Sequence, residues 1–372
     1  MQRLLEELRF RASSADALPQ LSLVAVVVGL LAAGTIVLFR LAVEWIQASF
    51  LPGYQPENYE GLDWPLRLLL PASGGLIVGL LLQLTATGPS VVGVVHVMER
   101  LALHQGRMMW RPALLQFIGA ALCIISGESV GREGPSVHLG AASGSLLGQQ
   151  LGLPNNSLQV LVACGVAAAI ATSFNTPLAG VAFAIEVILM EYTVVDFIPV
   201  IVASVVGAVV SRAVFGPDPA FPVPSVAMRS LLDLPYLLLL GLVIGSLAAT
   251  FTQSLAFLSR LGWNAPLWKR TTVGGLLVGI CALPAPSVMG IGYDTVQQIL
   301  LGQLDLETML VIIALKVLAT TTGLGLGLPG GLIGPTLFIG AAIGGLWGYL
   351  ATWPHQIMPP MCPSMRWSAS PA

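Results

Sequence analysis

Apolar residues run along this chain in blocks of about 20, long enough for a helix to cross a bilayer. Clear examples are residues 21–39, 236–255 and 309–328, which carry almost no charge. Glycine and proline interrupt many other blocks, which is typical of transporters whose helices stop inside the membrane around a polar site. The pattern predicts an all-α polytopic membrane protein with broken, re-entrant helices.

The same blocks set the expected order of elements. We expect one long helix near 21–50, a second near 66–86 and several shorter helices between 112 and 214. Further helices are expected at about 233–260 and 271–350. The predicted division of the chain is an N-terminal segment at 1–20, a first repeat at 21–214, a Pro-rich connector at 215–232, a second, incomplete repeat at 233–352 and a non-membrane tail at 353–372.

Composition narrows the class of protein. Of 372 residues, 55% are hydrophobic and 9% are charged, whereas a soluble domain carries about a quarter charged residues. Arg3, Arg9 and Arg11 precede the first apolar block, so the positive-inside bias predicts a cytoplasmic N-terminus without a cleavable signal peptide. A net charge of −2 gives no indication of nucleic-acid binding. The cysteines, which form no CxxC pair and are interpreted as free thiols, are Cys123, Cys164, Cys281 and Cys362.

An internal repeat relates the two halves of the chain. GREGPSVHLGAASGSLLG begins at Gly131 and GLIGPTLFIGAAIGGLWG begins at Gly331, an offset of 200 (331 − 131). Nine identities in register argue against the alternative of chance similarity between two Gly/Ala-rich helices. Three glycines in each repeat are spaced four apart and so lie along one helix face. The identities are Gly131/Gly331, Gly134/Gly334, Pro135/Pro335, Gly140/Gly340, Ala141/Ala341, Ala142/Ala342, Gly144/Gly344, Leu146/Leu346 and Gly148/Gly348.

Each repeat places a glycine-rich turn and a proline at the start of a helix. Proline is tolerated in the first helical turn, where its missing N–H would have no partner. The remaining free N–H groups and the helix dipole favour an anion at that end. Two such ends at membrane depth would therefore converge on one anion without a basic side chain.

Charged residues gather beside the first of these turns, where Glu128, Arg132 and Glu133 fall within six positions. An ionisable residue inside a membrane costs roughly 2.5 kcal/mol or more, so it is interpreted as functional by default. At a helix N-terminus, the carboxylate of Glu133 would compete with an anion for the same dipole. In the alternatives, Glu133 only pairs with Arg132, and Arg132 is structural rather than anion-binding. Glu128 is either a pore-edge charge or a capping residue.

The chain resembles the CLC family of chloride channels and chloride/proton antiporters in a set of motifs that occur in the family's order. They are GREGP (131–135), FNTPLAGVAFAIE (174–186), MGIGYDTV (289–296) and GGLIGPTLFIGA (330–341), with Lys316 before the last as a snorkelling or paired lysine. The resemblance extends from about residue 20 to about residue 350. It implies inverted repeats with broken helices around a central chloride, and a homodimer with one pore per subunit. We expect a multi-pass protein of a bacterial plasma membrane that carries chloride and needs no cofactor.

The resemblance also assigns the candidate site. Glu133 is the gating glutamate, whose carboxylate occupies an outer anion site and leaves it when protonated. The neighbouring residues of GREGP hold its loop, and residues 331–335 stand at the family's GxFxP motif. Ile333 replaces the usual Phe, a mild departure because backbone N–H groups bind the ion. The chloride-binding candidates are Gly131, Arg132, Gly134, Gly331, Leu332, Ile333, Gly334 and Val92.

Val92 marks a departure at the family's first anion-binding loop. The family's GSGIP is best matched by VVGVV (91–95), aligned on Gly93, so Val92 stands where a serine hydroxyl would touch chloride. Ser90 lies two residues away and could substitute for it. His96 is either a source of titrating charge or a plain loop histidine. Backbone N–H donors remain at this loop, but the missing hydroxyl leaves its anion selectivity and affinity open.

The C-terminal part departs from the family as well. Repeat one continues to about residue 214, whereas residues 353–372 are Pro-rich, aperiodic and unsuited to a bilayer helix. We expect the family's last helices, with the pore tyrosine that contacts chloride, and any cytoplasmic nucleotide-binding tail to be absent, as in a truncated or frameshifted gene. A non-conducting remnant that still dimerises is therefore one alternative function.

Proton coupling depends on the end of the LAGVAFAIE motif. Antiporters of the family generally carry a second glutamate directly after this motif, but here Glu186 is followed by Val187. An apolar side chain cannot hold a proton in transit. Glu186 is expected to face a structural partner and Glu191 to lie at the membrane edge. We expect a passive chloride channel or a weakly coupled exchanger, with a chloride/proton antiporter as the alternative.

An enzyme is a separate alternative. Ser126 or Ser129 could act with Glu128 and His138 as an intramembrane catalytic group. Neither serine lies in a recognisable nucleophile motif, and the sequence contains no HExxH or GxSxG. The protein is therefore expected not to be an enzyme.

Overall fold

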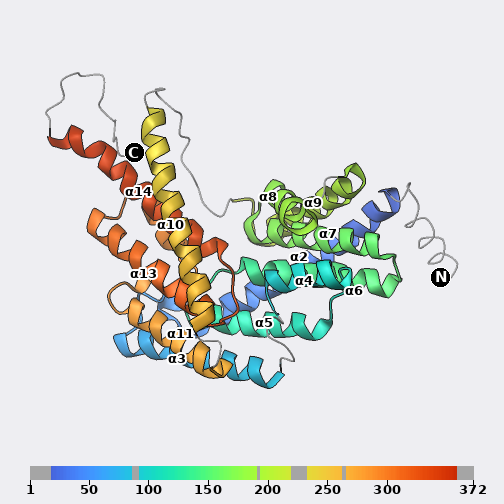
Figure 1. Cartoon of the computed structure of the whole chain (residues 1–372), viewed down its shortest axis with the longest axis horizontal. Helices are drawn as coiled ribbons and strands as arrows, with labels where there is room; N and C mark the ends of the chain where they lie inside the picture. The colour runs from blue at the N-terminus through green and yellow to red at the C-terminus, as the bar shows by residue number, and fades with distance from the viewer. Residues whose placement is uncertain (1–17, 86–91, 191–192, 219–232, 262–264, 358–372) are drawn as a thin grey trace.

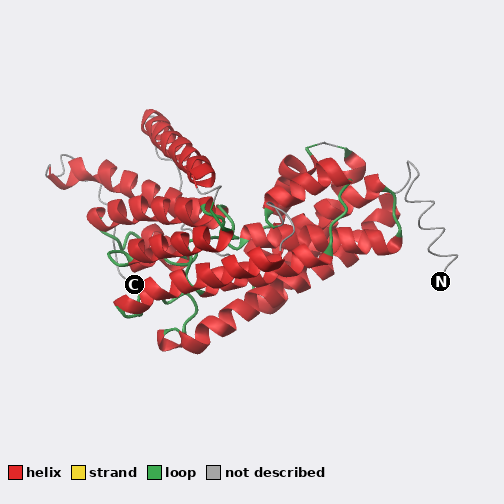
Figure 2. Ribbon diagram, turned by 60° about the horizontal axis from the view of Figure 1, so that its bottom comes forward, coloured by secondary structure: helices red, strands yellow, loops and turns green. Residues whose placement is uncertain are grey.

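The computed structural model describes residues 18–85, 92–190, 193–218, 233–261 and 265–357, and helices make up most of them (Figures 1 and 2). Among these residues, seven helices are long and apolar enough to cross a membrane, as the apolar blocks predict. The helices are α2 (Leu18–Phe50), η1 (Pro52–Tyr54), α3 (Trp64–Thr85), α4 (Val94–His104), α5 (Trp110–Ile125), α6 (Glu133–Leu151), α7 (Asn155–Phe174), α8 (Pro177–Phe183), η2 (Ala184–Leu189), α9 (Val194–Phe215), α10 (Asp233–Leu261), α11 (Leu267–Ala282), η3 (Pro286–Val288), α12 (Tyr293–Leu300), α13 (Leu306–Gly325) and α14 (Ile333–Ile357).

The predicted divisions of the chain fall partly outside the described residues. Most of the N-terminal segment, most of the Pro-rich connector and the end of the tail lie there. The last helix, α14, ends at Ile357, so the first residues of the predicted tail continue this helix. Cys123, Cys164 and Cys281 are buried and unpaired, as predicted, and Cys362 lies outside the described residues.

The helices form two groups, and the early helix α3 lies in the group that contains the late helices. In Figure 1, α2 and α4 to α9 lie on one side, and α10, α11, α13 and α14 lie on the other with α3. Although α3 comes early in the chain, it packs along α11. A Cβ atom on Gly75 would lie 2.3 Å from the carbonyl oxygen of Thr271, and one on Gly275 would lie 2.2 Å from that of Pro71. The backbones of these two helices therefore touch, which only glycine permits at such positions.

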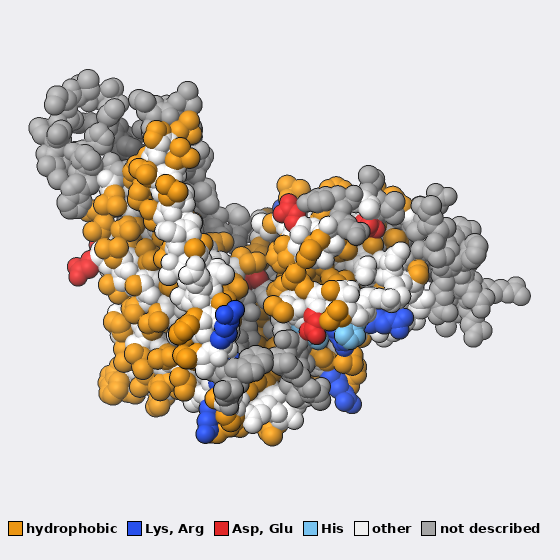
Figure 3. Space-filling view, viewed as in Figure 1, with side chains coloured by type: hydrophobic (Ala, Val, Ile, Leu, Met, Phe, Trp, Pro, Cys, Tyr) orange, Lys and Arg blue, Asp and Glu red, His pale blue; other side chains and the backbone are white. Residues whose placement is uncertain are grey.

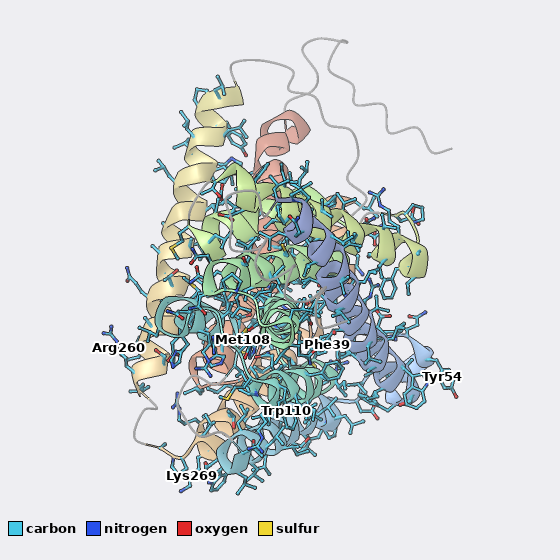
Figure 4. All side chains as sticks on the ribbon, turned by 90° about the vertical axis from the view of Figure 1, so that its right-hand side faces the viewer. Phe39, Tyr54, Met108, Trp110, Arg260 and Lys269 are labelled. Atoms are coloured by element: carbon cyan, nitrogen blue, oxygen red, sulfur yellow. The ribbon has the colours of Figure 1, made fainter. Side chains whose placement is uncertain are left out.

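The outer surface is apolar, as a bilayer requires. Hydrophobic side chains are spread over the described part of the face in Figure 3, with only scattered charges. On α10, Leu238 and Leu242 are each 71% exposed. Figure 4 shows the contrasting interior, where Phe39 and Met108 lie among the packed helices and are almost fully buried.

The two repeats differ in how their glycine faces are packed. On α6, a Cβ at Gly140 would lie 2.3 Å from the carbonyl oxygen of Gly165, and one at Gly144 would lie 2.0 Å from that of Leu161. This face of α6 is therefore in backbone contact with α7. At the corresponding Gly344 of α14, no described atom comes within 4 Å of the same position. The repeated sequence therefore supports two different environments.

Candidate functional site

The starts of the two repeats are paired directly. The N–H of Gly131 donates to the carbonyl oxygen of Gly331 at 2.8 Å, and the N–H of Gly331 donates to that of Gly131 at 2.7 Å. These residues form an isolated antiparallel bridge, although they lie 200 positions apart (331 − 131). Because α6 begins at Glu133 and α14 at Ile333, each two residues beyond the bridge, the two helix N-termini meet at one point.

Glu133 occupies the space between these two helix starts. Its side chain is buried, and the backbone N–H of Gly334 and the hydroxyl of Tyr293 approach its carboxylate. A Cβ atom on Gly131 or Gly331 would lie 1.9 or 2.2 Å from one of the carboxylate oxygens, and a Cβ on Gly334 would lie 2.8 Å from the other. The carboxylate therefore fits a pocket that glycines of both repeats leave open. An anion of similar size would compete for this position.

Three further chloride-binding candidates stand close to the bridge in the chain, namely Gly134, Leu332 and Ile333. Gly134 belongs to the same cluster, because a Cβ there would lie 2.5 Å from the carbonyl oxygen of Gly330. Leu332 and Ile333 stand at the start of α14 with exposed side chains. The structure thus brings the glycines of both motifs together around Glu133.

Arg132 has a different set of contacts. Among the described residues, no ion pair joins it to Glu133. Its Nη2 donates to the carbonyl oxygen of Ser173 at 3.2 Å, and its guanidinium lies over the ring of Tyr293, 5.1 Å from the centroid. Arg132 therefore links α6 to α7 and α12. Tyr293 was not among the predicted site residues, although it belongs to the MGIGYDTV motif.

A cavity of about 470 Å³ lies beside Arg132 and Tyr293. Acidic and basic side chains both line this cavity. In the loop before α3, burial raises the pKa of Glu57, while the nearby Arg132 guanidinium opposes this change. The cavity gives a polar space next to the Glu133 helix start. Its charged and polar lining includes Arg40, Glu44, Glu57, Arg132, Asn175 and Tyr293.

Lys316 is buried in α13, so it does not snorkel to the membrane surface, and of the two predicted alternatives the paired lysine holds, with backbone carbonyls as its partners. Its Nζ donates to the carbonyl oxygens of Val288 and Gly290, at 2.9 Å each, and lies 4.7 Å from the ring centroid of Phe338. These carbonyls belong to the turn that leads into α12. Lys316 therefore holds the segment that presents Tyr293 to Arg132.

Val92 lies just before α4. It is partly buried, and its link to α6 runs through the next residue. The N–H of Gly93 donates to Nδ1 of His138 at 3.3 Å, and the same nitrogen lies 3.4 Å from Oε1 of Gln116. Ser90, the predicted substitute for the missing hydroxyl, lies outside the described residues.

The serines of the enzyme alternative do not form a catalytic group. Ser126 donates to a backbone carbonyl of α5, and Ser129 pairs with a threonine of α13. His138 is engaged elsewhere, with Gly93 and Gln116. Glu128 is fully buried, and neither carboxylate oxygen is hydrogen-bonded among the described residues, so its side chain does not cap a helix.

The segment expected to control proton coupling forms a π-helical turn, η2. Glu186 is exposed there, and it makes no ion pair within the described part of the chain, contrary to the expected structural partner. Val187 is partly buried against the core that surrounds α7. Glu191 lies outside the described residues. The position that follows the LAGVAFAIE motif is therefore an apolar contact.

These features define a class: a multi-pass membrane protein in which two repeated helix N-termini enclose one carboxylate. The family model described as "Voltage gated chloride channel" matches residues 74–365, so the chain belongs to that family. It is 33% identical to the voltage-gated ClC-type chloride channel ClcB of Escherichia coli over 338 residues, which are 88% of this chain and 79% of that protein. It is 34% identical to a ClcB-like protein of Ralstonia nicotianae over 309 residues, which are 81% of this chain and 71% of that protein.

Solved structures show the same fold. A slow cyanobacterial Cl⁻/H⁺ antiporter matches with a TM-score of 0.75 at 22% identity, covering 91% of this chain and 81% of the antiporter. A CLC-type fluoride/proton antiporter matches with a TM-score of 0.75 at 23% identity, covering 90% of this chain and 84% of that protein. At these identities the likeness concerns the fold alone.

Proposed function

We propose that this protein lets chloride cross the membrane through a CLC-type pore gated by Glu133. The observation that carries the proposal is the pairing of Gly131 with Gly331, which joins two helix N-termini around one buried carboxylate. Free N–H groups and helix dipoles at such a point stabilise negative charge without a basic side chain. The backbone itself would then bind chloride as cargo, and no cofactor is needed.

Gating follows from competition for the same position. An ionised Glu133 carboxylate occupies the glycine-lined space and excludes chloride. Protonation removes the negative charge and with it the attraction to the helix ends, so the side chain leaves and chloride enters. The polar cavity beside Arg132 and Tyr293 supplies an approach to this point. Flux should therefore rise as the pH falls.

We further propose that transport is passive or only weakly coupled to protons. The main support is Val187, which provides no titratable group after the LAGVAFAIE motif. The similarity to ClcB, a protein named as a channel, agrees with this proposal. A chloride/proton antiporter is the alternative, in which protons move by another route.

Reversal potentials measured in liposomes test whether the protein transports chloride and whether this transport is coupled to protons. The purified protein, alone and fused to the C-terminal helices of a relative, would be studied under separate chloride and proton gradients. A potential that follows only the chloride gradient supports a channel, and a clear shift with the proton gradient supports the antiporter. Absence of flux for chloride and other small anions from both forms would contradict anion transport altogether and favour a non-conducting remnant.

Assembly and orientation are part of the same proposal. The family resemblance suggests a homodimer with a pore in each subunit, in a bacterial plasma membrane with the N-terminus in the cytoplasm. Cross-linking in native membranes and protease access to a tag before Leu18 would test these two points. A monomer, or a tag reached only from outside, would contradict the respective expectation.

A further inference from the structure

Tyr293 lies between the polar cavity and the carboxylate of the proposed gate. It is the first residue of α12, and its partly buried side chain lines the cavity. The guanidinium of Arg132 lies over its ring, 5.1 Å from the centroid, and its hydroxyl approaches the carboxylate of Glu133. This one side chain from the second repeat therefore reaches from the cavity wall to the glycine-lined space of the candidate site.

The neighbours of the Tyr293 hydroxyl fix the direction of its hydrogen bond. Arg132 approaches the hydroxyl oxygen as well, and a guanidinium can only donate. An ionised carboxylate can only accept, so the hydroxyl proton points to Glu133 and the oxygen faces Arg132. A rotation of the hydroxyl toward Arg132 would place two donors against each other. Glu57, on the cavity wall, also acts on this hydroxyl through its charge. Tyr293 is therefore a donor toward the glycine-lined space.

The backbone before Tyr293 holds this hydroxyl in place. The N–H of Gly290, three residues earlier, donates to the carbonyl oxygen of Gly127 at 3.1 Å. The Nζ of Lys316 donates to the carbonyl oxygen of Gly290 at 2.9 Å. The turn into α12 is thus tied both to α13 and to the segment that leads to α6. Because the turn is ordered before an anion arrives, the hydroxyl loses little conformational freedom on binding.

The Glu133 carboxylate marks the position that an anion would take. Two donors of different kinds approach it, the backbone N–H of Gly334 and the hydroxyl of Tyr293. A Cβ atom on Gly131 or Gly331 would lie 1.9 or 2.2 Å from one of its oxygens, so the space admits a small negative group and no added side chain. When the protonated Glu133 side chain leaves, a chloride ion in its place would meet the same hydroxyl.

We infer that Tyr293 is an anion-binding residue, whose hydroxyl donates to the Glu133 carboxylate in the closed site and to the transported anion in the open site. The inference deepens the proposed anion transport and rests on it. Tyr293 supplies a side-chain hydroxyl in a chain that carries Val92 where the family's first anion-binding loop has a serine. A hydroxyl donor favours an anion whose charge is concentrated on one atom, because the attraction rises as charges come closer. We therefore expect Tyr293 to favour chloride over thiocyanate, whose charge is spread over several atoms.

Calorimetric titrations in detergent solution at neutral pH test this role, with chloride and thiocyanate as the two probes. The protein would carry Glu133→Ala, so that no carboxylate competes for the glycine-lined space. Adding Tyr293→Phe, which keeps the ring beside Arg132 and removes only the hydroxyl, should raise the Kd for chloride on the order of tenfold, the effect of one hydrogen bond to a charged group. The Kd for thiocyanate should rise clearly less. Tyr54→Phe, at a tyrosine that is 83% exposed, should leave both values unchanged.

A crystal structure of the Glu133→Ala protein with bromide tests the same contact without altering Tyr293. We expect the anomalous peak of bromide within hydrogen-bond reach of the Tyr293 hydroxyl oxygen. A peak out of its reach, an unchanged chloride Kd with Tyr293→Phe, or an equal loss for both anions, as a general distortion would cause, would overturn the inference and leave the proposed transport standing. Absence of chloride and bromide binding to the Glu133→Ala protein would contradict the proposed transport and the inference together.

Discussion

At the candidate site, Glu133 is held between glycines that belong to both repeats. The carboxylate carries charge where the helix ends favour it, and its position depends on the absence of side chains at Gly131 and Gly331. Lys316 acts nearby on the backbone, because its Nζ holds the turn before α12 through carbonyl oxygens. Single residues therefore contribute in two ways, by charge at the anion position and by fixing the loops around it.

Replacing Glu133 by Gln should remove the titratable gate. The amide resembles the protonated acid, so flux should be high at neutral pH and change by less than about twofold with acidification, where the unsubstituted protein changes several-fold. Chloride-electrode recordings from liposomes at a series of external pH values would measure this. A variant with the pH profile of the unsubstituted protein would show that Glu133 is not the gate.

Replacing Lys316 by Met should destabilise the protein. The side chain stays unbranched and apolar along its stem but leaves the carbonyls of Val288 and Gly290 unpaired in the interior, at a cost of about 2 kcal/mol. Thermal unfolding in detergent would measure the change. Lys269→Met, which alters an exposed lysine of α11, serves as the control. Equal melting temperatures for the two variants would contradict the role assigned to Lys316.

Among the elements, α6 and α14 share a sequence pattern but differ in their neighbours. The glycine face of α6 touches the backbone of α7, whereas no described atom approaches the corresponding face of α14 at Gly344. A row of small residues allows close packing but does not supply the helix that packs there. The same glycine spacing therefore predicts that another helix can pack closely, but it does not predict which helix does so.

A matched pair of substitutions tests this difference. Gly144→Ala places a methyl group 2.0 Å from the Leu161 carbonyl oxygen, and such overpacking costs about 1–3 kcal/mol. This exceeds the gain of up to about 1 kcal/mol from replacing a helical glycine. Gly344→Ala makes no such clash and should keep or raise the melting temperature. If both variants lowered the melting temperature equally, a neighbour would have to lie against α14 at Gly344, contrary to this expectation.

For the whole molecule, the two repeats are joined at the Gly131–Gly331 bridge and along α3 and α11. The first repeat surrounds its half of the site with α2 and α7, which pack on α6. Among the described residues, nothing comparable covers Leu332, Ile333 and the glycine face of α14 in the second half. We therefore expect the anion path to be better enclosed on one side than on the other.

Supplying helices that cover α14 should strengthen transport. Fusion of the C-terminal helices of a relative should raise chloride flux per protein, because these helices would cover the face of α14 that no described residue covers. The same fusion should make Gly344→Ala destabilising, since the methyl group would meet a neighbour. Strong, selective flux from the 372-residue protein that does not change on fusion would contradict this expectation.

The sequence by itself determined the class and much of the candidate site, because these depend on local properties. The length of apolar blocks predicts membrane helices, and the Gly-Pro turns place Glu133 at a helix start wherever that helix lies. Only the tertiary structure decided that Gly131 pairs with Gly331, that Lys316 binds carbonyls and that His138 meets Gly93. Such contacts join residues far apart in the chain. Their distances depend on how whole helices pack, which no local pattern specifies.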